Sequence, residues 1–174
     1  MKADSPNLKK FPQEFNAQNT FISGNTDVLL NIAPAELAKL NAENKTLLVT
    51  DPYLFPPKPY QAYKGELLTI LRSTKAKTIV FCAKSKINNT LFQEVYNDLQ
   101  KQGVQLTFDT RLEECHDRFW YCPETEKCVI FGTSMNGIGR KICRIDMLRD
   151  DEVVELKKYF TDAGIISSGE DDGE

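Results

Sequence analysis

The residues whose types and spacing suit them to chemistry gather in one stretch, residues 115–144. It holds the only histidine of the chain, His116, followed by Arg118 and, after a short apolar run, by Ser134 and Asn136. An imidazole can attack phosphorus, and a guanidinium binds two phosphate oxygens at once. Serine and asparagine side chains, with the N–H groups of a glycine-containing turn, can hold the remaining oxygens. The pattern indicates a phosphate site, although on residue types alone a structural histidine and an ordinary turn are the simpler interpretation.

The order of these parts resembles the signature half of the phospholipase D superfamily. That signature is His-x-Lys, an Asp after four further residues, and Gly-Ser-x-Asn after six more. Four residues of this chain take the places of its His, Lys, Ser and Asn: His116, Arg118, Ser134 and Asn136. The resemblance covers about residues 45–148 and includes the phrase Asp-Pro-Tyr at residues 51–53, which is similar to one in many members.

The chain also departs from the signature. Pro123 stands in the place of the Asp, Thr133 stands in the place of the Gly before Ser, and the spacing from His116 to Asn136 is three residues longer. The His-Asp-Arg variant is similar to that of phospholipase D-like domains attached to membrane-trafficking MIT modules. This similarity implies binding of a phospholipid headgroup without catalysis.

The family mechanism uses two histidines, one to attack phosphorus and one to protonate the leaving oxygen. Because the chain has one histidine and one motif copy, the resemblance implies a homodimer in which His116 of both subunits meets at a two-fold axis. Neither a cofactor nor a metal is expected. Without the motif Asp, the nearest acids to orient the imidazole are Glu113, Glu114 and Asp117, of which Asp117 should point to the opposite strand face.

Two functions therefore stay open. The first is a nuclease-type phosphodiesterase, a hydrolase that acts on a phosphodiester as a homodimer through His116. The second is an inactive module that binds phosphate-bearing ligands, such as nucleic acid or a phospholipid headgroup, or a protein partner. The retained His, Ser and Asn favour the first function, and the missing Asp and Lys favour the second. Slow or no turnover alongside intact anion binding is expected.

The stretch contains other patterns that suggest different chemistry. Four side chains offer zinc ligands: Cys115, His116, Cys122 and Cys128. Their spacing is not that of Cys-x2–4-Cys knuckles, so buried free thiols are predicted. Residues 137–139 do not form a dinucleotide loop, because no third glycine follows and no helix starts there. A basic cluster indicates either a solvated strand face or a contact to a polyanion: Arg140, Lys141 and Arg144.

The elements that must position these residues alternate along the chain. Strands are predicted at 45–50, 78–83 and 104–109, a hairpin at 118–122 and 128–132, and a short strand within 16–24. Helices are predicted at 35–41 with Pro34 at the start, at 63–73, at 90–102, and at 151–159 with a cap at Asp150 or Asp151. Apolar strands separated by helices indicate an α/β domain, with a mixed, mostly parallel sheet and helices on both faces. Leu47–Thr50, Ile79–Cys82 and Val104–Phe108 are expected to be central strands.

The 174 residues, 41% of them hydrophobic, fit one globular domain, which we expect over residues 16–166. A flexible arm is expected at 1–15 and a disordered acidic tail at 167–174. Without the four acidic residues of that tail, the formal net charge of −3 becomes about +1, which does not indicate a strongly basic nucleic-acid binder. Five cysteines without a signal peptide or transmembrane run indicate reduced thiols and a cytoplasmic protein.

Overall fold

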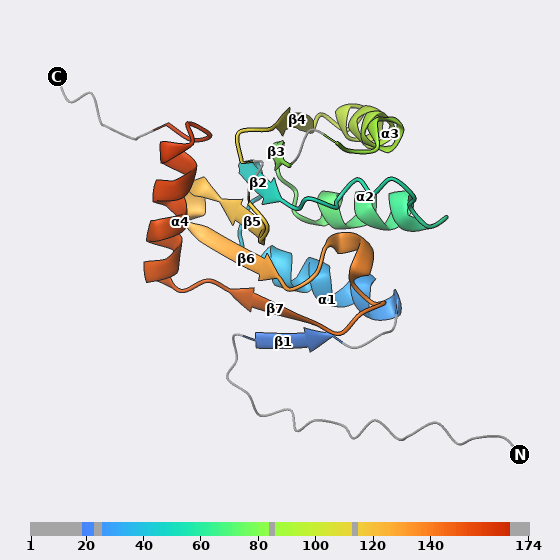
Figure 1. Cartoon of the computed structure of the whole chain (residues 1–174), viewed down its shortest axis with the longest axis horizontal. Helices are drawn as coiled ribbons and strands as arrows, with labels where there is room; N and C mark the ends of the chain where they lie inside the picture. The colour runs from blue at the N-terminus through green and yellow to red at the C-terminus, as the bar shows by residue number, and fades with distance from the viewer. Residues whose placement is uncertain (1–18, 23–25, 84–85, 113–114, 168–174) are drawn as a thin grey trace, which may run out of the picture.

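A computed structural model describes residues 19–22, 26–83, 86–112 and 115–167. Their strands form one seven-stranded sheet in the order β1-β7-β6-β5-β2-β3-β4 (Figure 1). The strand bounds in chain order are β1 Asn19–Ile22, β2 Thr46–Thr50, β3 Thr78–Cys82, β4 Gln105–Asp109, β5 Arg118–Cys122, β6 Lys127–Phe131 and β7 Cys143–Met147. The arm predicted at 1–15, and residues 168–174 of the predicted tail, lie outside the described residues.

The parallel strand pairs lie at one end of the sheet. β2 pairs in parallel with β3, and β3 with β4, because a helix connects each of these strands to the next. The other four neighbouring pairs are antiparallel. The β5–β6 pair is the predicted hairpin, closed by the 3-10 turn Pro123–Thr125. The predicted α/β class with a mixed sheet is thus confirmed, and the predicted parallel pairing holds at one end of the sheet only.

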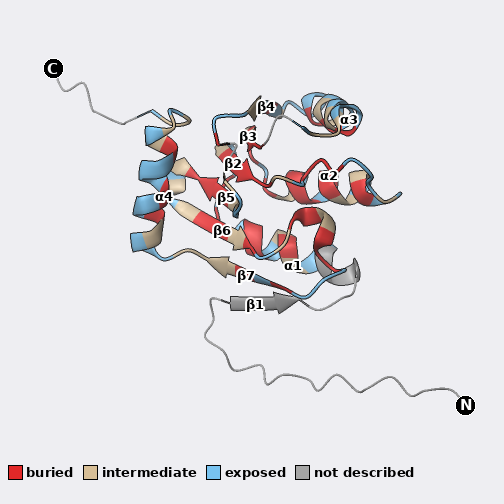
Figure 2. Cartoon of the chain, in the orientation of Figure 1, coloured by how far each residue is buried: buried red, intermediate tan, exposed pale blue. Residues whose placement is uncertain are grey.

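Helices cover both faces of the sheet, as predicted. Their bounds are α1 Thr26–Ala38, α2 Tyr63–Ser73, α3 Asn89–Gln100 and α4 Asp150–Asp162. Val49 and Trp120 belong to the hydrophobic cluster that β-strands share with α1, α2 and α3. Leu48 and Tyr121 belong to the cluster shared with α4, because successive strand residues point to opposite faces. Figure 1 shows α4 on the side of the sheet away from α2 and α3, and Figure 2 shows buried residues along the strands and the inward helix faces.

Several local predictions agree closely with the structure. α2 has the predicted bounds, and α3 lies where a helix was predicted and buries one apolar stripe: Leu91, Val95 and Leu99. Trp120 is fully buried in the core, where its ring packs near Phe131. No helix in the described part of the chain is long and apolar enough to cross a lipid bilayer.

Two predictions about the strands and helices were wrong. The strand predicted as central at 104–108 is β4, an edge strand whose Gln105 and Thr107 are exposed. The helix predicted at 35–41 begins at Thr26, so that Pro34 lies inside α1. The carbonyl that loses its helical partner belongs to Leu30, an exposed residue, so water can satisfy it.

The cap predicted for α4 at Asp150 or Asp151 is also wrong. Both aspartates lie inside the first turn of the helix, where their negative charges interact favourably with the positive end of the helix dipole. The N-cap residue is Arg149, whose backbone N–H donates to Glu152 Oε2 at 2.9 Å.

Candidate functional site at the carboxyl edge of the sheet

Three segments meet at one edge of the sheet: the carboxyl end of β2, the beginning of β5 and the carboxyl end of β6. Val49 lies opposite Trp120 in the β2–β5 pair, and Arg118 lies opposite Phe131 in the β5–β6 pair. Continuing the antiparallel β2–β5 register by two residues brings Asp51 opposite Arg118. Side chains that follow these strand ends therefore share one neighbourhood.

Asp51 is a fully buried carboxylate at the centre of this edge. Its Oδ2 accepts hydrogen bonds from the Ser134 hydroxyl at 2.8 Å and the Met135 N–H at 3.0 Å. Its Oδ1 accepts from the Tyr53 N–H at 3.0 Å. Burial raises the pKa of this carboxyl above its ordinary value, while the three donors and the positive charge of Arg118 act in the opposite direction.

Arg118, the first residue of β5, carries a half-buried guanidinium. Its Nε is buried and has no hydrogen-bond partner among the described residues. The positive charge acts on Asp51 across the strand pair, but no direct ion pair joins the two side chains in the described part of the chain. An N–H group removed from water without an acceptor is unfavourable, so this position is suited to an anionic oxygen.

Thr50 holds the beginning of β5. Its buried hydroxyl donates to the backbone carbonyl of Asp117 and accepts from the N–H of Phe119, both at 2.8 Å. These two residues flank Arg118. A single side chain at the end of β2 therefore fixes the backbone on both sides of the guanidinium.

The segment after β6 forms a tight 3-10 turn, Met135–Gly137. Met135 and Ile138 are buried in the core, whereas Asn136 is half-buried at the surface. A Cβ on Gly137 would lie 2.5 Å from Thr133 Oγ1, so the absence of a side chain allows this close approach. The glycine thus shapes the turn that presents Asn136.

His116 lies in the loop that runs from the edge strand β4 back to β5. Its imidazole is exposed, and within the described residues no side chain or backbone group is hydrogen-bonded to it. Of the acids considered as orienting partners, Asp117 is exposed, and Glu113 and Glu114 lie outside the described residues.

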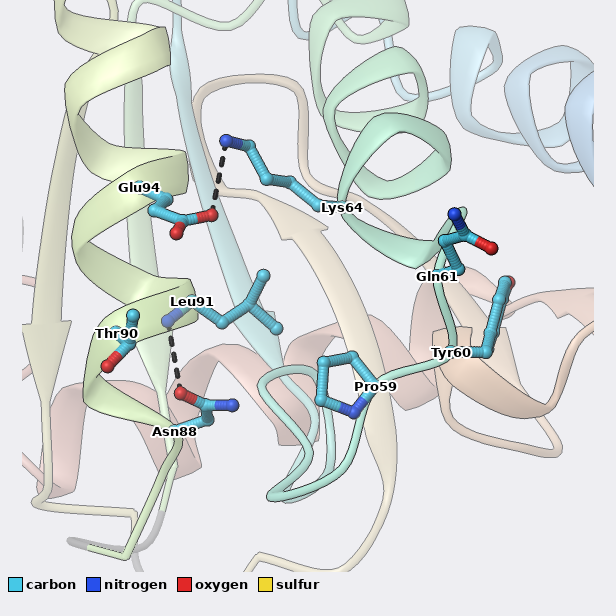
Figure 3. A pocket seen from close by; sticks show the side chains of 8 residues that line it. All are labelled: Pro59, Tyr60, Gln61, Lys64, Asn88, Thr90, Leu91 and Glu94. Atoms are coloured by element: carbon cyan, nitrogen blue, oxygen red, sulfur yellow. Dashed lines mark hydrogen bonds and ion pairs between the residues drawn. The ribbon is translucent and has the colours of Figure 1, made fainter.

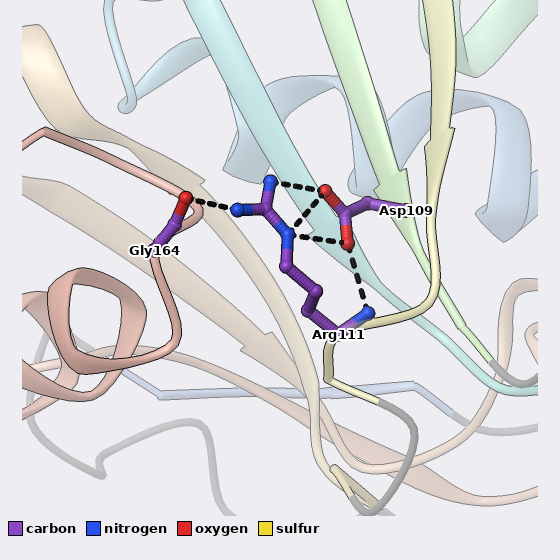
Figure 4. Close-up of polar contacts among 3 residues, drawn as sticks. All are labelled: Asp109, Arg111 and Gly164. Atoms are coloured by element: carbon purple, nitrogen blue, oxygen red, sulfur yellow. Dashed lines mark hydrogen bonds and ion pairs between the residues drawn. The ribbon is translucent and has the colours of Figure 1, made fainter.

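The beginning of this loop is tied to the end of α4 (Figure 4). The Arg111 guanidinium binds the Asp109 carboxylate through Nε at 2.9 Å and donates to the backbone carbonyl of Gly164. The next residue, Leu112, is buried, and its carbonyl accepts from the Cys115 N–H at 3.0 Å. The loop therefore leaves β4 in a fixed direction.

The structure relates the four predicted site residues unequally. Asp51 interacts with two of them: it attracts the positive charge of Arg118 and accepts a hydrogen bond from Ser134. Asn136 lies in the turn that follows Ser134. His116 lies two residues before Arg118 at the same edge, exposed to solvent. The Ser134 hydroxyl is buried and donates to Asp51, so its proton is already committed within the protein.

Sequence reasoning missed the two residues that organise this edge, Thr50 and Asp51. The available signal was their place at the carboxyl end of an apolar strand, with Thr50 its last residue and Asp51 the next, since functional side chains gather at the carboxyl ends of parallel strands. Asp51 also begins the Asp-Pro-Tyr phrase, whose resemblance to family members does not by itself assign a role to the carboxylate.

The four candidate zinc ligands do not converge. Cys122 belongs to the hydrophobic cluster on one face of the sheet and Cys128 to the cluster on the other. The cysteines are free, and both of these are buried, in agreement with the prediction. Nor do the described residues contain a group of three side chains placed to hold a metal ion.

The basic cluster is divided between different contacts. The Arg140 guanidinium lies 3.4 Å from the centre of the Tyr60 ring, a cation–π contact. Arg144 pairs with Asp146, its second neighbour along β7, while Lys141 is exposed. The cluster therefore does not form a continuous basic strand face.

A pocket of about 300 Å³ opens elsewhere, beside the N-terminal ends of α2 and α3 (Figure 3). It is lined by Pro59, Tyr60, Gln61, Lys64, Asn88, Thr90, Leu91 and Glu94. Its main polar groups are already paired: Lys64 with Glu94 at 3.1 Å, and Asn88 with the Leu91 N–H at 3.0 Å. None of the predicted site residues lines it.

Comparison with known proteins bears on the fold. No family model matches the chain, and no curated protein matches it. Among solved structures, polyphosphate kinase from Porphyromonas gingivalis is similar, with a TM-score of 0.51 and 10% sequence identity. The match covers 87% of this chain and 26% of the kinase, so the chain spans about a quarter of that protein. At this level of identity the likeness shows a shared fold.

A second solved structure is that of TrmBL2, an archaeal chromatin protein with a novel mode of DNA binding. The match has a TM-score of 0.46 and 12% identity, and it covers 91% of this chain and 55% of TrmBL2.

Proposed function

We propose that the carboxyl edge of the sheet binds a phosphate-bearing ligand and that Arg118 is its principal donor. The half-buried guanidinium carries this proposal, because its buried Nε has no partner among the described residues. Leaving such a donor unsatisfied costs about 1–3 kcal/mol, and the described protein does not use this Nε–H to complete its own hydrogen bonding.

The surroundings of Arg118 favour an anion over a neutral ligand. Asn136 stands half-exposed in the turn that Asp51 holds through Ser134 and Met135. The negative charge of Asp51 is directed inward, since its two oxygens accept three hydrogen bonds from the protein. No ion pair joins Asp51 to Arg118 among the described residues, so it leaves the guanidinium charge available to a ligand.

The same geometry supports binding without turnover. The family mechanism requires a histidine held for in-line attack, whereas His116 is exposed and no described residue holds its ring. Ser134 already donates its hydroxyl proton to Asp51. The shared fold with a kinase named for polyphosphate is consistent with a phosphate ligand.

The test is a calorimetric titration of inorganic phosphate into the wild type and Arg118→Ala. Loss of a charged hydrogen bond of about 1.5–3 kcal/mol should weaken binding about ten- to hundredfold. Arg72→Ala is the matched control, because it removes an equal charge from an exposed position in the last turn of α2. Equal affinities of Arg118→Ala and the wild type would rule out this site.

Because His116 is exposed, its ring is accessible to a second copy of the chain, and this accessibility favours a second function, phosphodiester hydrolysis by a homodimer in which two such rings meet. Its test is hydrolysis of bis(p-nitrophenyl) phosphate by the wild type and His116→Ala, alongside sedimentation at micromolar concentration. Hydrolysis by a wild-type dimer that His116→Ala abolishes would establish this function. A monomer without hydrolysis that still binds phosphate would leave the binding module alone.

A further inference from the structure

We propose that Thr50 is a positioning residue of the phosphate site, acting on the direction of the Arg118 side chain without touching the ligand. This inference rests on the function proposed above. Thr50 is fully buried, and its hydroxyl is bonded on both sides of Arg118, to the carbonyl of Asp117 and the N–H of Phe119.

The Thr50 hydroxyl takes the place of the backbone hydrogen bonds between β2 and β5 at this point. The registered pairs of β2 and β5 are Leu48 with Tyr121 and Val49 with Trp120, so the pairing stops before Arg118. Beyond those pairs, the 2.8 Å bonds of Thr50 hold the β5 backbone against β2. A binding group must be held within about 0.5 Å of its productive position, which is the precision that two short bonds provide.

Thr50 and the adjacent Asp51 each hold one of the two segments that form the site. Thr50 holds the segment that carries Arg118, and Asp51 holds the turn that carries Asn136. Loss of the Thr50 hydroxyl should therefore move the guanidinium relative to a turn that stays in place.

The chain offers a matched control in Thr74, at the end of α2. Thr74 is also buried, and its hydroxyl donates to the Leu71 carbonyl at 2.7 Å and accepts from the Ala76 N–H at 3.3 Å. Thr74→Val and Thr50→Val each remove one donated and one accepted hydrogen bond from a buried site. Only the second removes them beside Arg118.

The experiment titrates inorganic phosphate into Thr50→Val, Thr50→Ser and Thr74→Val and records the melting temperature of each. Thr50→Val should bind about five- to tenfold more weakly, the effect of about one hydrogen bond. Thr50→Ser keeps the hydroxyl and should restore affinity. Thr74→Val should lower the melting temperature without changing affinity. If Thr50→Val does not fold, Thr50→Ala removes the same two bonds.

Amide hydrogen exchange of Phe119 supplies a readout independent of the ligand, since its N–H loses its acceptor in Thr50→Val. Faster exchange together with unchanged phosphate affinity would overturn the inference, provided that Arg118→Ala still loses binding. Unchanged exchange of the Phe119 N–H in Thr50→Val would also overturn the inference, because the hydroxyl would then not hold this N–H. If Arg118→Ala binds phosphate as tightly as the wild type, the proposed function fails, and the positioning role fails with it.

Discussion

The Ser134 hydroxyl donates a 2.8 Å hydrogen bond to Asp51 Oδ2, joining residues that lie 83 positions apart in the chain. The same oxygen accepts the Met135 N–H at 3.0 Å. The turn after β6 is therefore pinned to the end of β2 through a buried carboxylate. Ser134, which resembles a motif residue, therefore has a structural role, because its hydroxyl proton is donated to Asp51 and not to a ligand.

Replacing Asp51 by asparagine should destabilise the protein. An amide keeps the shape but presents an NH2 group to at least one of the three donors that now face the carboxylate. We expect the free energy of unfolding in urea to fall by about 1–3 kcal/mol. Asp162→Asn, on the exposed surface of α4, should change it by less than about 0.5 kcal/mol. Equal stability of Asp51→Asn and the wild type would contradict the role of the carboxylate.

Replacing Arg118 by lysine separates charge from geometry. Lysine keeps the positive charge but lacks the planar fork of donors and the buried Nε–H. We expect phosphate affinity between those of the wild type and Arg118→Ala, and a weakening of binding as salt increases in all variants that still bind. Calorimetric titration at two ionic strengths measures both effects. A lysine variant that binds as tightly as the wild type would show that charge alone is recognised.

The Asp109–Arg111 pair should make stability depend on acid pH. The hydrogen bonds from Arg111 hold the pKa of Asp109 below its ordinary value of 3.8. Because the folded pKa is the lower one, the pair stabilises the fold above about pH 3.8, and this contribution is lost as pH falls through the folded pKa.

The measurement for this pair is the unfolding free energy of the wild type and Arg111→Met from pH 7 to pH 2. We expect a difference between them at pH 7 that disappears at the acid end. Arg72 has no such acidic partner among the described residues. The difference in unfolding free energy between Arg72→Met and the wild type should therefore not change with pH. A difference that persists at pH 2 would assign the Arg111 effect to its bond with Gly164 instead.

Gly137 and Thr133 should show strong coupling. In Gly137→Ala the new Cβ would lie 2.5 Å from Thr133 Oγ1, and accommodating it should cost about 1–3 kcal/mol of unfolding free energy. In a Thr133→Ala background the nearest remaining side-chain atom is the Cβ at 3.5 Å, so the same change should cost much less. A double-mutant cycle in urea measures this coupling, and additive effects would refute the contact.

The sequence by itself determined the local elements. The bounds of α2, the buried stripe of α3 and the β5–β6 hairpin follow from periodicity and turn residues, which act over a few positions. The alternation of apolar strands and helices likewise determined the α/β class, because such strands need cover on both faces.

Only the tertiary structure decided where those elements stand and what their ends bring together. β4 became an edge strand through the order of the sheet, and β1 joined β7 across most of the chain. The bonds of Thr50 to the β5 segment and of Asp51 to the turn after β6 span 67 to 84 positions. No periodicity encodes such contacts, since they arise when the sheet aligns the ends of strands that are distant in sequence.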